Sequence, residues 1–468
     1  MLKKIDIPRE VVEIISTLNA NGYEGYIVGG CVRDILMGRT PMDWDLTTSA
    51  KPEEIKRLFK RTYDTGIAHG TVTVILNNKH FEITTYRIEG IYEDHRRPKE
   101  VTFTNDLEED LSRRDFTMNA IAYHPKEGFI DPTGGIEDIW KKSIRCVGDP
   151  NKRFEEDALR MLRGIRFSSQ LNFTIEENTL KAINTNAHLI SYISAERIKE
   201  ELDKILLSDY IHKFILLHET GILKFILPEV DRCFTVEQNH PHHVDNVGIH
   251  TLKALEVVDK ILTLKWTILF HDIGKPEHKT TDEKGINHFY GHVEKSVELA
   301  EKIMKRLKFD KKSMNHILKL IKWHDNRIKE DKPSVKEVLY HIGEEAFLDL
   351  LKVQSADAKA QNPVYYQEKE DKLKNLYKIY EEIKINNECF TLKDLALNGQ
   401  DLIQIGIKEG KRIGEMLEHF LKIVIEHPEF NEKEILCQRK IYAINKPHVI
   451  EELYVLYNMG FLLYRKFL

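Results

Sequence analysis

The chain has 468 residues, of which 41% are hydrophobic and 31% charged, and its formal net charge at pH 7 is −5. This length is too great for one hydrophobic core and predicts three or four domains of an ordinary globular protein. The acidic balance argues against a uniformly basic nucleic-acid binder, and no apolar run approaches the roughly 18 residues of a membrane span. Basic residues are nevertheless concentrated locally, which would allow a groove for a polyanion, in the ranges 95–99, 113–114, 141–166 and 408–412.

The cysteines are scattered and form no CxxC pair. This distribution argues against a zinc finger or a disulfide framework and favours reduced thiols in the cytoplasm. The five positions are Cys31, Cys146, Cys233, Cys389 and Cys437.

The N-terminal part is predicted to alternate helices and strands. Residues 8–20 have helical apolar spacing, and 26–28 form an apolar run typical of a strand. Residues 52–61 predict a helix that begins at a proline. The stretches 70–76 and 80–86 are rich in β-branched residues and flank a short turn, so they predict a hairpin.

Two glycines, Gly29 and Gly30, directly follow the strand at 26–28 and precede Arg33. Glycines allow a tight turn that brings backbone N–H groups close to an anion, and a guanidinium suits phosphate. A lone glycine pair is most often no more than a turn, so the prediction of a phosphate site needs support from residues further along the chain.

Asp43 and Asp45 come next, and in a strand they would share one face with Thr47. Neighbouring carboxylates repel unless a cation lies between them, and such oxygen ligands suit Mg²⁺. A lone pair of this kind is most often an exposed strand end, but after a phosphate-binding turn it indicates metal-assisted phosphoryl transfer. If the strand at 80–86 lies alongside, Glu82 would supply a third carboxylate; the alternative is an exposed strand glutamate.

The glycine turn and the two aspartates, flanked by VRD and LTT, resemble the head of class II tRNA nucleotidyltransferases. These are the CCA-adding enzymes and their poly(A) polymerase relatives, within the polymerase β superfamily. The stretch 110–124 extends the match, and the resemblance places Arg114 on the nucleotide triphosphate. A charged helix start is the alternative. The full-length segment 89–103 resembles a further family pattern through Asp94, Arg96, Arg97, Pro98, Val101 and Phe103.

Residues 154–171 predict one helix that carries Asp157, Arg160, Arg163 and Arg166 at a spacing of three. Positions i and i+3 of a helix are neighbours, so Asp157 is expected beside Arg160. In an arbitrary helix this would be a salt bridge with two solvated arginines. The segment resembles the family motif EDxxRxxR, which implies that Asp157 and Arg160 read the incoming base. The later arginines, Arg163 and Arg166, would then serve the triphosphate and the placement of the helix.

Residues 240–360 contain a second group of chemically active side chains. Single histidines are most often surface or core residues, but a His-Asp pair with histidines before and after it resembles the HD phosphohydrolase superfamily. Its imidazoles and carboxylates would hold one or two divalent ions of undecided identity, which polarise a phosphate and activate water. The candidate ligands are His250, His271, Asp272, His292, His324 and Asp357.

The fold class expected is therefore multidomain α+β: a polymerase β-like nucleotidyltransferase head with a mixed sheet, followed by all-α neck, HD and tail domains. The neck would select nucleotides and bind RNA, and the tail would bind tRNA. The predicted ranges are head 1–145, neck 146–230, HD domain 231–365, tail 366–440 and a C-terminal extension of unassigned role at 441–468.

The resemblance implies a template-independent enzyme that adds the 3′-terminal CCA to tRNA from CTP and ATP. Two Mg²⁺ ions at Asp43 and Asp45 would support the chemistry. One alternative adds only A or makes poly(A), and a second is an HD phosphohydrolase whose N-terminal half merely binds RNA. No DNA or membrane partner is expected, and the oligomeric state stays open. The triphosphate would be held by Gly29, Gly30, Arg33 and Arg114.

Overall fold

The computed structural model describes residues 5–90, 92–93, 97–98, 101–242, 244–407 and 410–437. The chain divides into two compact units, and each is described by itself. The first unit comprises Met1–Lys322 and Lys359–Asn362, and the second comprises Trp323–Ala358 and Pro363–Leu468. The predicted extension at 441–468 lies outside the described residues.

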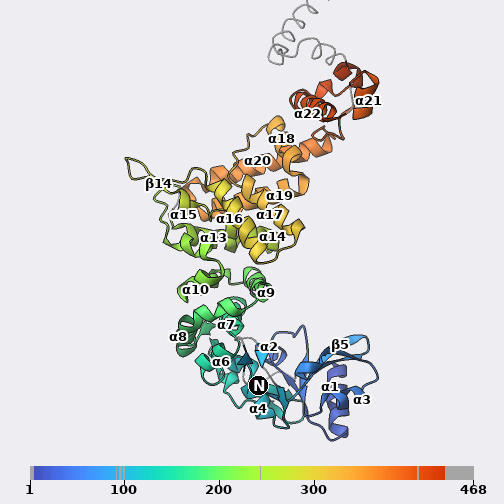
Figure 1. The fold of residues 1–468 in the computed structure, drawn as a ribbon, viewed down its shortest axis with the longest axis vertical. Coiled ribbons are helices and arrows are strands. Elements are labelled where there is room, and N and C mark those ends of the chain that lie inside the picture. Colours follow the sequence, from blue (N-terminus) through green and yellow to red (C-terminus); the bar gives the residue numbers. More distant parts are fainter. Residues whose placement is uncertain are drawn as a thin grey trace, which may run out of the picture. The chain divides into compact units, whose positions relative to one another are not determined.

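A seven-stranded mixed sheet forms the centre of the N-terminal part, which is blue in Figure 1. The strand order is β11-β10-β1-β2-β5-β4-β3. Strands β2 and β5 run parallel, and the other neighbouring pairs run antiparallel. The mixed sheet predicted for the head is thus confirmed. Its strands are β1 (Gly25–Val28), β2 (Asp45–Thr48), β3 (Thr62–Gly66), β4 (Thr71–Leu76), β5 (Lys79–Thr85), β10 (Ala122–His124) and β11 (Gly128–Ile130).

The predicted hairpin is β4–β5. Its turn consists of Asn77 and Asn78, which have positive φ angles of 51° and 60°. Two such residues form the turn type whose twist matches that of antiparallel strands. Along the hairpin Val72 and Ile83 are fully buried, whereas Glu82 is exposed on the opposite face of β5. The alternation therefore directs Glu82 away from the hydrophobic core.

Among the described residues of this part, five helices accompany the strands, and α1 shows how such a helix buries its apolar face. Its residues Val11, Ile14, Ile15 and Leu18 recur at helical spacing and are all buried. The helices are α1 (Arg9–Ala20), α2 (Gly30–Leu36), α3 (Pro52–Leu58), α4 (Leu107–Ser112) and α5 (Gly135–Trp140).

The predicted connection 89–103 begins and ends in strands. Strand β6 (Arg87–Glu89) pairs with β9 (Val101–Phe103), and β7 (Tyr92–Glu93) pairs with β8 (Arg97–Pro98). Asp94 and Arg96, which carry part of the family resemblance, lie outside the described residues.

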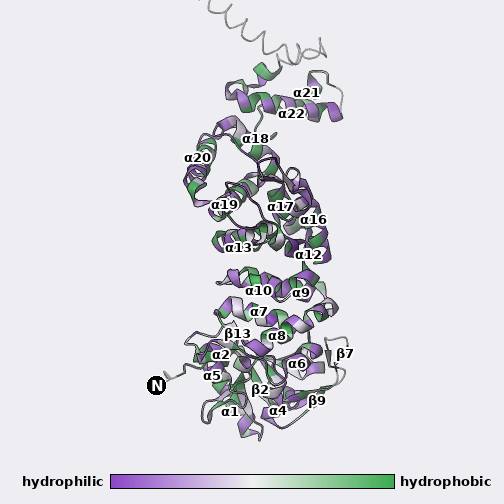
Figure 2. Ribbon diagram, turned by 90° about the vertical axis from the view of Figure 1, so that its left-hand side faces the viewer, coloured by the Kyte–Doolittle hydropathy of each residue, from purple (hydrophilic) through white to green (hydrophobic). Residues whose placement is uncertain are grey.

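Helices dominate the rest of the first unit, as predicted, apart from the short strands β12 (Ser143–Ile144), β13 (Thr174–Ile175), β14 (Thr280–Thr281) and β15 (Asn287–His288). Hydrophobic and hydrophilic residues are interleaved along these helices (Figure 2). The helices are α6 (Pro150–Glu156), α7 (Leu159–Leu171), α8 (Glu177–Asn186), α9 (Ala195–Leu206), α10 (Ile215–Glu219), α11 (Leu223–Ile226), α12 (Pro228–Asp231), α13 (Val247–Val257), α14 (Leu262–Phe270), α15 (Lys275–His278), α16 (His292–Arg306) and α17 (Lys311–Trp323).

The prediction of one helix over 154–171 is wrong. Helix α6 ends at Glu156, and Asp157 follows with extended dihedral angles of φ −136° and ψ 102°. The Asp157 carboxylate accepts a hydrogen bond of 3.1 Å from the backbone N–H of Leu159, at the start of α7. Aspartate competes well for such N–H groups outside a helix, which explains the break. The i, i+3 relation of a continuous helix therefore does not apply to Asp157 and Arg160.

The second unit is helical, and its C-terminal part has a small core of its own. Leu397, Leu402, Phe420, Val424 and Leu436 are buried together there. The helices are α18 (Lys332–Ile342), α19 (Glu344–Ala360, apart from its last two residues), α20 (Tyr366–Ile385), α21 (Gly399–Gln404) and α22 (Lys411–Glu426). Among the helices described in both units, none is both long and apolar enough to cross a membrane.

Candidate active site

The glycine turn between β1 and α2 is built around Gly29. Its φ of 79° and ψ of −137° favour glycine strongly. A Cβ atom at this position would lie 3.3 Å from Nη1 of Arg114 and 3.9 Å from Oδ2 of Asp45. The turn therefore passes its bare backbone directly against two of the predicted site residues.

Three carboxylates gather beside this turn. Asp45 begins β2 and is the register partner of Glu82 on the parallel strand β5. Asp43 precedes β2 and lies in a bend, so the prediction that Asp43 and Asp45 share a strand face is wrong. Burial of the Asp45 carboxyl raises its pKa, the negative charges of Glu82 and Asp43 raise it further, and Arg114 opposes them. Asp45 as a whole residue is exposed to solvent. Its carboxyl oxygen Oδ2 nevertheless lies beside the Gly29 turn.

Arg114 is held in place by a buried acid that sequence analysis missed. Its Nη2 lies 3.1 Å from Oδ2 of Asp110, which is fully buried and also pairs with Arg113 at 2.8 Å. Within the described part of the chain, the buried Nε of Arg114 has no hydrogen-bond partner. The nitrogen beside the Gly29 turn is Nη1, and the charge of the guanidinium there suits an anionic ligand. The spacing of Asp110 to Arg113 and Arg114, i to i+3 and i+4 near the end of α4, was the available signal.

Arg33, predicted to bind triphosphate, contributes to the turn itself. Its Nε and Nη2 donate to Oδ1 of Asp34 at 3.0 and 2.8 Å, and its Nη1 donates to Oδ1 of Asn119 at 2.9 Å. The side chain is largely buried. These bonds fix the guanidinium near the start of α2, and its role towards a triphosphate stays a prediction.

Asp157 and Arg160, which are predicted to read the base, each form an ion pair with a third residue and not with one another. Asp157 forms an ion pair of 3.0 Å with Arg197 on α9. Arg160 pairs with Glu156 at 2.5 Å, and its guanidinium also donates to the backbone carbonyl of Arg113 at 3.2 Å. Sequence reasoning missed Arg197, since its partner is 40 residues away.

The two later arginines of the motif form internal ion pairs. Arg163 lies 2.7 Å from Asp115 and Arg166 lies 2.6 Å from Glu201. Burial alone would raise the pKa of Asp115, but Arg163 and the N–H of Phe116 outweigh it and hold that pKa at about 2. Both pairs tie α7 to neighbouring elements, a structural function that the sequence prediction had included only as helix placement.

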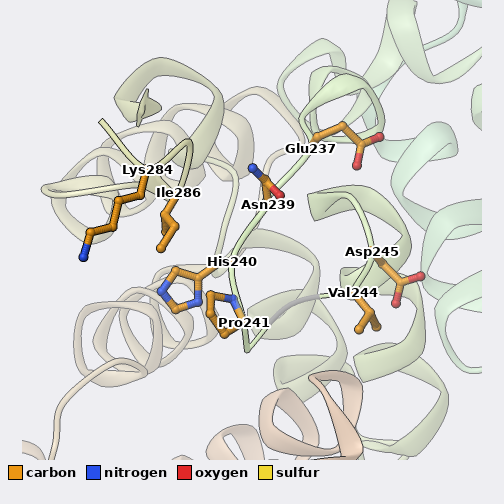
Figure 3. A pocket seen from close by; sticks show the side chains of 8 residues that line it. All are labelled: Glu237, Asn239, His240, Pro241, Val244, Asp245, Lys284 and Ile286. Carbon is orange, nitrogen blue, oxygen red and sulfur yellow. The ribbon is translucent and has the colours of Figure 1, made fainter. Parts of the chain in front are cut away.

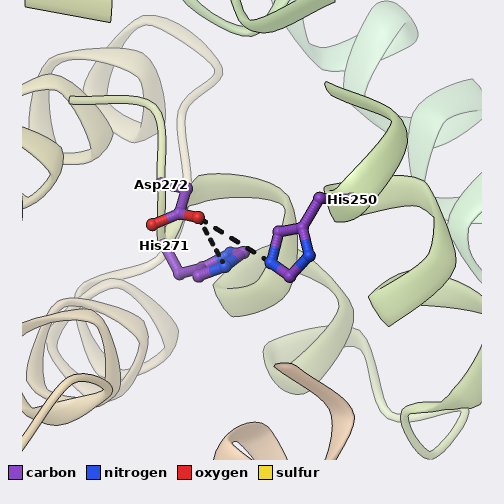
Figure 4. A group of neighbouring side chains, drawn as sticks. All are labelled: His250, His271 and Asp272. Carbon is purple, nitrogen blue, oxygen red and sulfur yellow. Dashed lines mark ion pairs between the residues drawn. The ribbon is translucent and has the colours of Figure 1, made fainter. Parts of the chain in front are cut away.

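Part of the predicted HD group is brought together in the first unit. Oδ2 of Asp272 lies 3.2 Å from Nε2 of His271 and 3.8 Å from Nε2 of His250 (Figure 4). Oδ1 of Asp272 lies 3.4 Å from Nε2 of His292. The ligand atoms of His250, His271 and Asp272 all fall within 4.8 Å of one another. The remaining two candidates, His324 and Asp357, belong to the second unit.

The three histidines share one orientation. Nδ1 of His250, His271 and His292 contacts the backbone carbonyl oxygens of Ala360, Ile268 and Phe289 at 3.3, 2.7 and 2.9 Å. A carbonyl oxygen only accepts, so each Nδ1 carries a proton. In the neutral imidazole the Nε2 lone pair then faces the Asp272 carboxylate, and two acceptors at this distance need a cation between them. This is the tautomer in which a histidine ligates a metal. Lys275 also contacts the carboxylate, at 2.6 Å from Oδ2, and a metal would share Asp272 with it.

The first unit also contains a pocket of about 660 Å³ (Figure 3). Gln238, which lies in sequence between the lining residues Glu237 and Asn239, accepts a hydrogen bond of 2.9 Å from Nζ of Lys275 and so connects the pocket wall to the histidine group. The sequence analysis did not identify this cavity. It is lined by Glu237, Asn239, His240, Pro241, Val244, Asp245, Lys284 and Ile286.

A mixed sheet that carries a glycine turn, three converging carboxylates and an arginine, followed by helices, defines a nucleotidyltransferase. Three family models match the chain: the "Poly A polymerase head domain" over 25–145, the "Probable RNA and SrmB- binding site of polymerase A" over 172–234, and the putative "tRNA nucleotidyltransferase domain 2" over 277–439. The third match crosses the predicted boundary at 365, and the domain boundaries stay predictions.

Relatives identify the family within this class. The CCA-adding enzyme of Anoxybacillus flavithermus is 35% identical over 430 residues, which cover 92% of this chain and 95% of the relative. That of Enterococcus faecalis is 34% identical over 443 residues, covering 93% and 97%. The crystal structure of the Bacillus stearothermophilus CCA-adding enzyme in complex with CTP superposes with a TM-score of 0.72 at 30% identity, covering 94% of this chain and 99% of that one. The chain belongs to the CCA-adding enzyme family.

Proposed function

We propose that this protein adds the 3′-terminal CCA to tRNA, using CTP and ATP, in the cytoplasm. The observation that carries the proposal is the juxtaposition of Asp45 and Glu82 on parallel strands, with the Gly29 turn and Arg114 beside them. Among the relatives, the Bacillus stearothermophilus enzyme was crystallised with CTP, and a Thermotoga maritima CCA-adding enzyme, 21% identical, was solved in complex with tRNA.

The donor set fits Mg²⁺. Carboxylate oxygens are its preferred protein ligands, and the negative charges of Glu82 and Asp43 raise the pKa of Asp45, which supports a cation among these three groups. These three residues would hold the metal, which when bound stabilises the charge on the transferred phosphate and the leaving group. Arg114 would present its Nη1, beside the Gly29 turn, to the triphosphate, and the Gly29–Gly30 backbone would allow that triphosphate to approach closely.

The reaction joins the RNA to the nucleotide and releases pyrophosphate. The terminal 3′-hydroxyl oxygen forms a bond to the α-phosphorus, and the bond from that phosphorus to the bridging oxygen of the β-phosphate breaks. Pyrophosphate leaves with the electron pair, and the hydroxyl proton passes to solvent. Asp157 and Arg160 would contact the base, because an acceptor beside a donor complements the amino edges of cytosine and adenine.

Labelled CTP, ATP, GTP and UTP, each offered to tRNAs lacking the CCA end, ending in C and ending in CC, test the proposal. We expect C on the first two substrates and a single A on the third. Addition of A alone would identify an A-adding enzyme, and a long A tract would identify a poly(A) polymerase. No incorporation with Mg²⁺ or Mn²⁺ would refute the proposed function.

We propose a second, metal-dependent phosphohydrolase site at His250, His271, Asp272 and His292. The shared tautomer of the three histidines supports it. Equilibrium dialysis with Mn²⁺, Fe²⁺ and Ni²⁺, followed by hydrolysis of bis(p-nitrophenyl) phosphate, tests the site. We expect one or two tightly bound ions per chain and hydrolysis that depends on them. If none of the three ions is retained, the site is refuted; if an ion is retained without hydrolysis, the site is structural.

A further inference from the structure

Asp110 is a buried carboxylate for which the proposed chemistry has no direct use. It lies on α4 and is 0% exposed. Its oxygens accept from Arg113 and Arg114, from the hydroxyl of Thr47 at 3.3 Å and from the backbone N–H of Arg87 at 3.3 Å. Removing a buried charge that accepts from this many donors costs considerable free energy, and the charge restrains the position of each donor.

Arg114 is the bound group that reaches the active site. One of its terminal nitrogens is held by Asp110, and the other lies 3.3 Å from the Cβ position of Gly29. The same position is 3.9 Å from Oδ2 of Asp45. The Arg114 guanidinium is near enough to the Asp45 carboxylate to oppose the rise of its pKa, so a released Arg114 could pair with that carboxylate.

The connection from Asp110 to the catalytic strand is short. Thr47 lies two residues after Asp45 on β2, so both side chains leave the same face of that strand. The Thr47 hydroxyl contacts Asp110. Asp110 thus contacts both β2, the strand that begins with Asp45, and Arg114.

Arginines of the predicted neck also bind the backbone at the end of α4. Arg153 donates to the backbone carbonyl of Ser112 at 2.6 Å, and Arg160 donates to that of Arg113 at 3.2 Å. The end of α4 is therefore fixed in two ways. Asp110 binds the side chains that follow the helix, and Arg153 and Arg160 bind its backbone carbonyl groups. If Asp110 were replaced, we would expect the Arg114 side chain to move and its backbone to stay in place, because the preceding carbonyl groups are hydrogen-bonded.

We propose that Asp110 is a positioning residue that holds Arg114 beside the Gly29 turn and away from the carboxylates of Asp43, Asp45 and Glu82. It thereby keeps those carboxylates available to divalent metal and keeps Arg114 available to the triphosphate. The inference rests on the proposed nucleotidyltransferase site and adds to it a residue outside the reacting groups.

Asp110→Asn tests this in a His271→Ala background, which removes the proposed histidine metal site, with Mn²⁺ binding by calorimetry in the absence of nucleotide as the main readout. We expect about a tenfold weaker Mn²⁺ affinity, because the released Arg114 competes for the metal ligands, and about a tenfold higher KM for CTP. Arg114→Met in the Asp110→Asn background should restore Mn²⁺ affinity while KM for CTP stays high. The matched control is Asp138→Asn, a buried acid of the same unit that binds Thr117 and Arg145 instead.

Unchanged Mn²⁺ affinity and KM in folded Asp110→Asn would overturn the proposal, as would equal losses in the Asp138→Asn control. If the single variant does not fold, the Asp110→Asn/Arg114→Met double variant is compared with Arg114→Met alone. Equal Mn²⁺ affinities in those two support action through Arg114, and a difference of threefold or more overturns it. CTP incorporation by the unaltered protein tests the proposed function separately.

Discussion

Replacing Glu82 by glutamine removes the charge of the proposed third metal ligand with little change in shape. Glu82 is exposed on β5, so the substitution leaves the core intact. It is also the register partner of Asp45, and its charge is the largest cause after burial of the raised Asp45 pKa. Two effects of opposite sign are therefore expected from one substitution.

The first effect is a loss of rate. A metal ligand supports several kcal/mol of transition-state stabilisation, and losing about 3–4 kcal/mol lowers kcat/KM by roughly 10²–10³-fold. The second is a shift in pH dependence. Two unit charges separated by the general spacing of neighbouring strands, about 4.8 Å, repel by about 0.9 kcal/mol in water and about 3.5 kcal/mol at an effective dielectric of 20. Since Asp45 reaches solvent, the repulsion lies nearer the lower of these two values, and removing it lowers the pKa of Asp45.

The sign of the pH shift is set by the raised pKa of Asp45. Activity requires the ionised carboxylate, so it is lost as the pH falls through that pKa. Removing Glu82 lowers the pKa and moves the acid limb of the pH–rate profile towards lower pH. The rate should therefore fall at every pH while the acid limb extends.

The assay is single-turnover CTP incorporation on tRNA lacking its CCA end, measured against pH and Mg²⁺. His80→Gln, two residues earlier on the same exposed side of β5, is the matched control and should leave both quantities unchanged. A kcat/KM of Glu82→Gln within threefold of the unaltered protein would refute the ligand role. A normal acid limb combined with a large loss of rate would refute the electrostatic coupling to Asp45.

Three further predictions concern other ion pairs and the histidine site. Asp115→Asn should lower the free energy of unfolding, measured in urea, by about 2–3 kcal/mol at pH 7. The pKa of Asp115 in the folded protein is lowered to about 2, so the difference between the two proteins should be complete above about pH 5 and should shrink as the pH falls towards 2. His271→Ala should abolish most divalent-metal retention yet spare CTP incorporation, with His278→Ala as the control, and metal retained by the first variant would exclude His271 as a ligand. Arg197→Met releases Asp157, so the kcat/KM preference for CTP over UTP should fall about three- to tenfold, and an unchanged preference would show that the pair is structural.

Local patterns in the sequence were sufficient for much of the head. Two stretches of β-branched residues around a short turn predicted the β4–β5 hairpin, and the glycine pair predicted a turn at Gly29. Each of these depends on residues within a few positions of one another. The placement of Glu82 beside Asp45 was left open because strand pairing between distant segments has no local signature.

The errors came where a side chain competes with regular structure. Asp157 fitted a helical spacing, yet its carboxylate binds the N–H of Leu159 and its backbone is extended. Its partner Arg197 is remote in sequence, so spacing arguments assigned it to Arg160 instead. Asp110 was passed over because nothing in composition shows that an acid within a charged run will be fully buried.

The distribution of ion pairs explains why one arginine of the predicted triphosphate set differs from the rest. Arg33, Arg163 and Arg166 are each opposed by a carboxylate, and a nucleotide would have to compete with those acids for them. Arg114 shares Asp110 with Arg113, so two cations divide one charge, and its buried Nε has no partner in the described chain. The Arg114 guanidinium lies beside the Gly29 turn, and the mutually repelling carboxylates of Asp43, Asp45 and Glu82 lie next to it. On the proposed function, a metal-bound triphosphate would match both, since its phosphates suit the arginine and its cation suits the carboxylates. A free anion or a free metal would match only one of the two, so we expect the metal–triphosphate pair to be the ligand of this site.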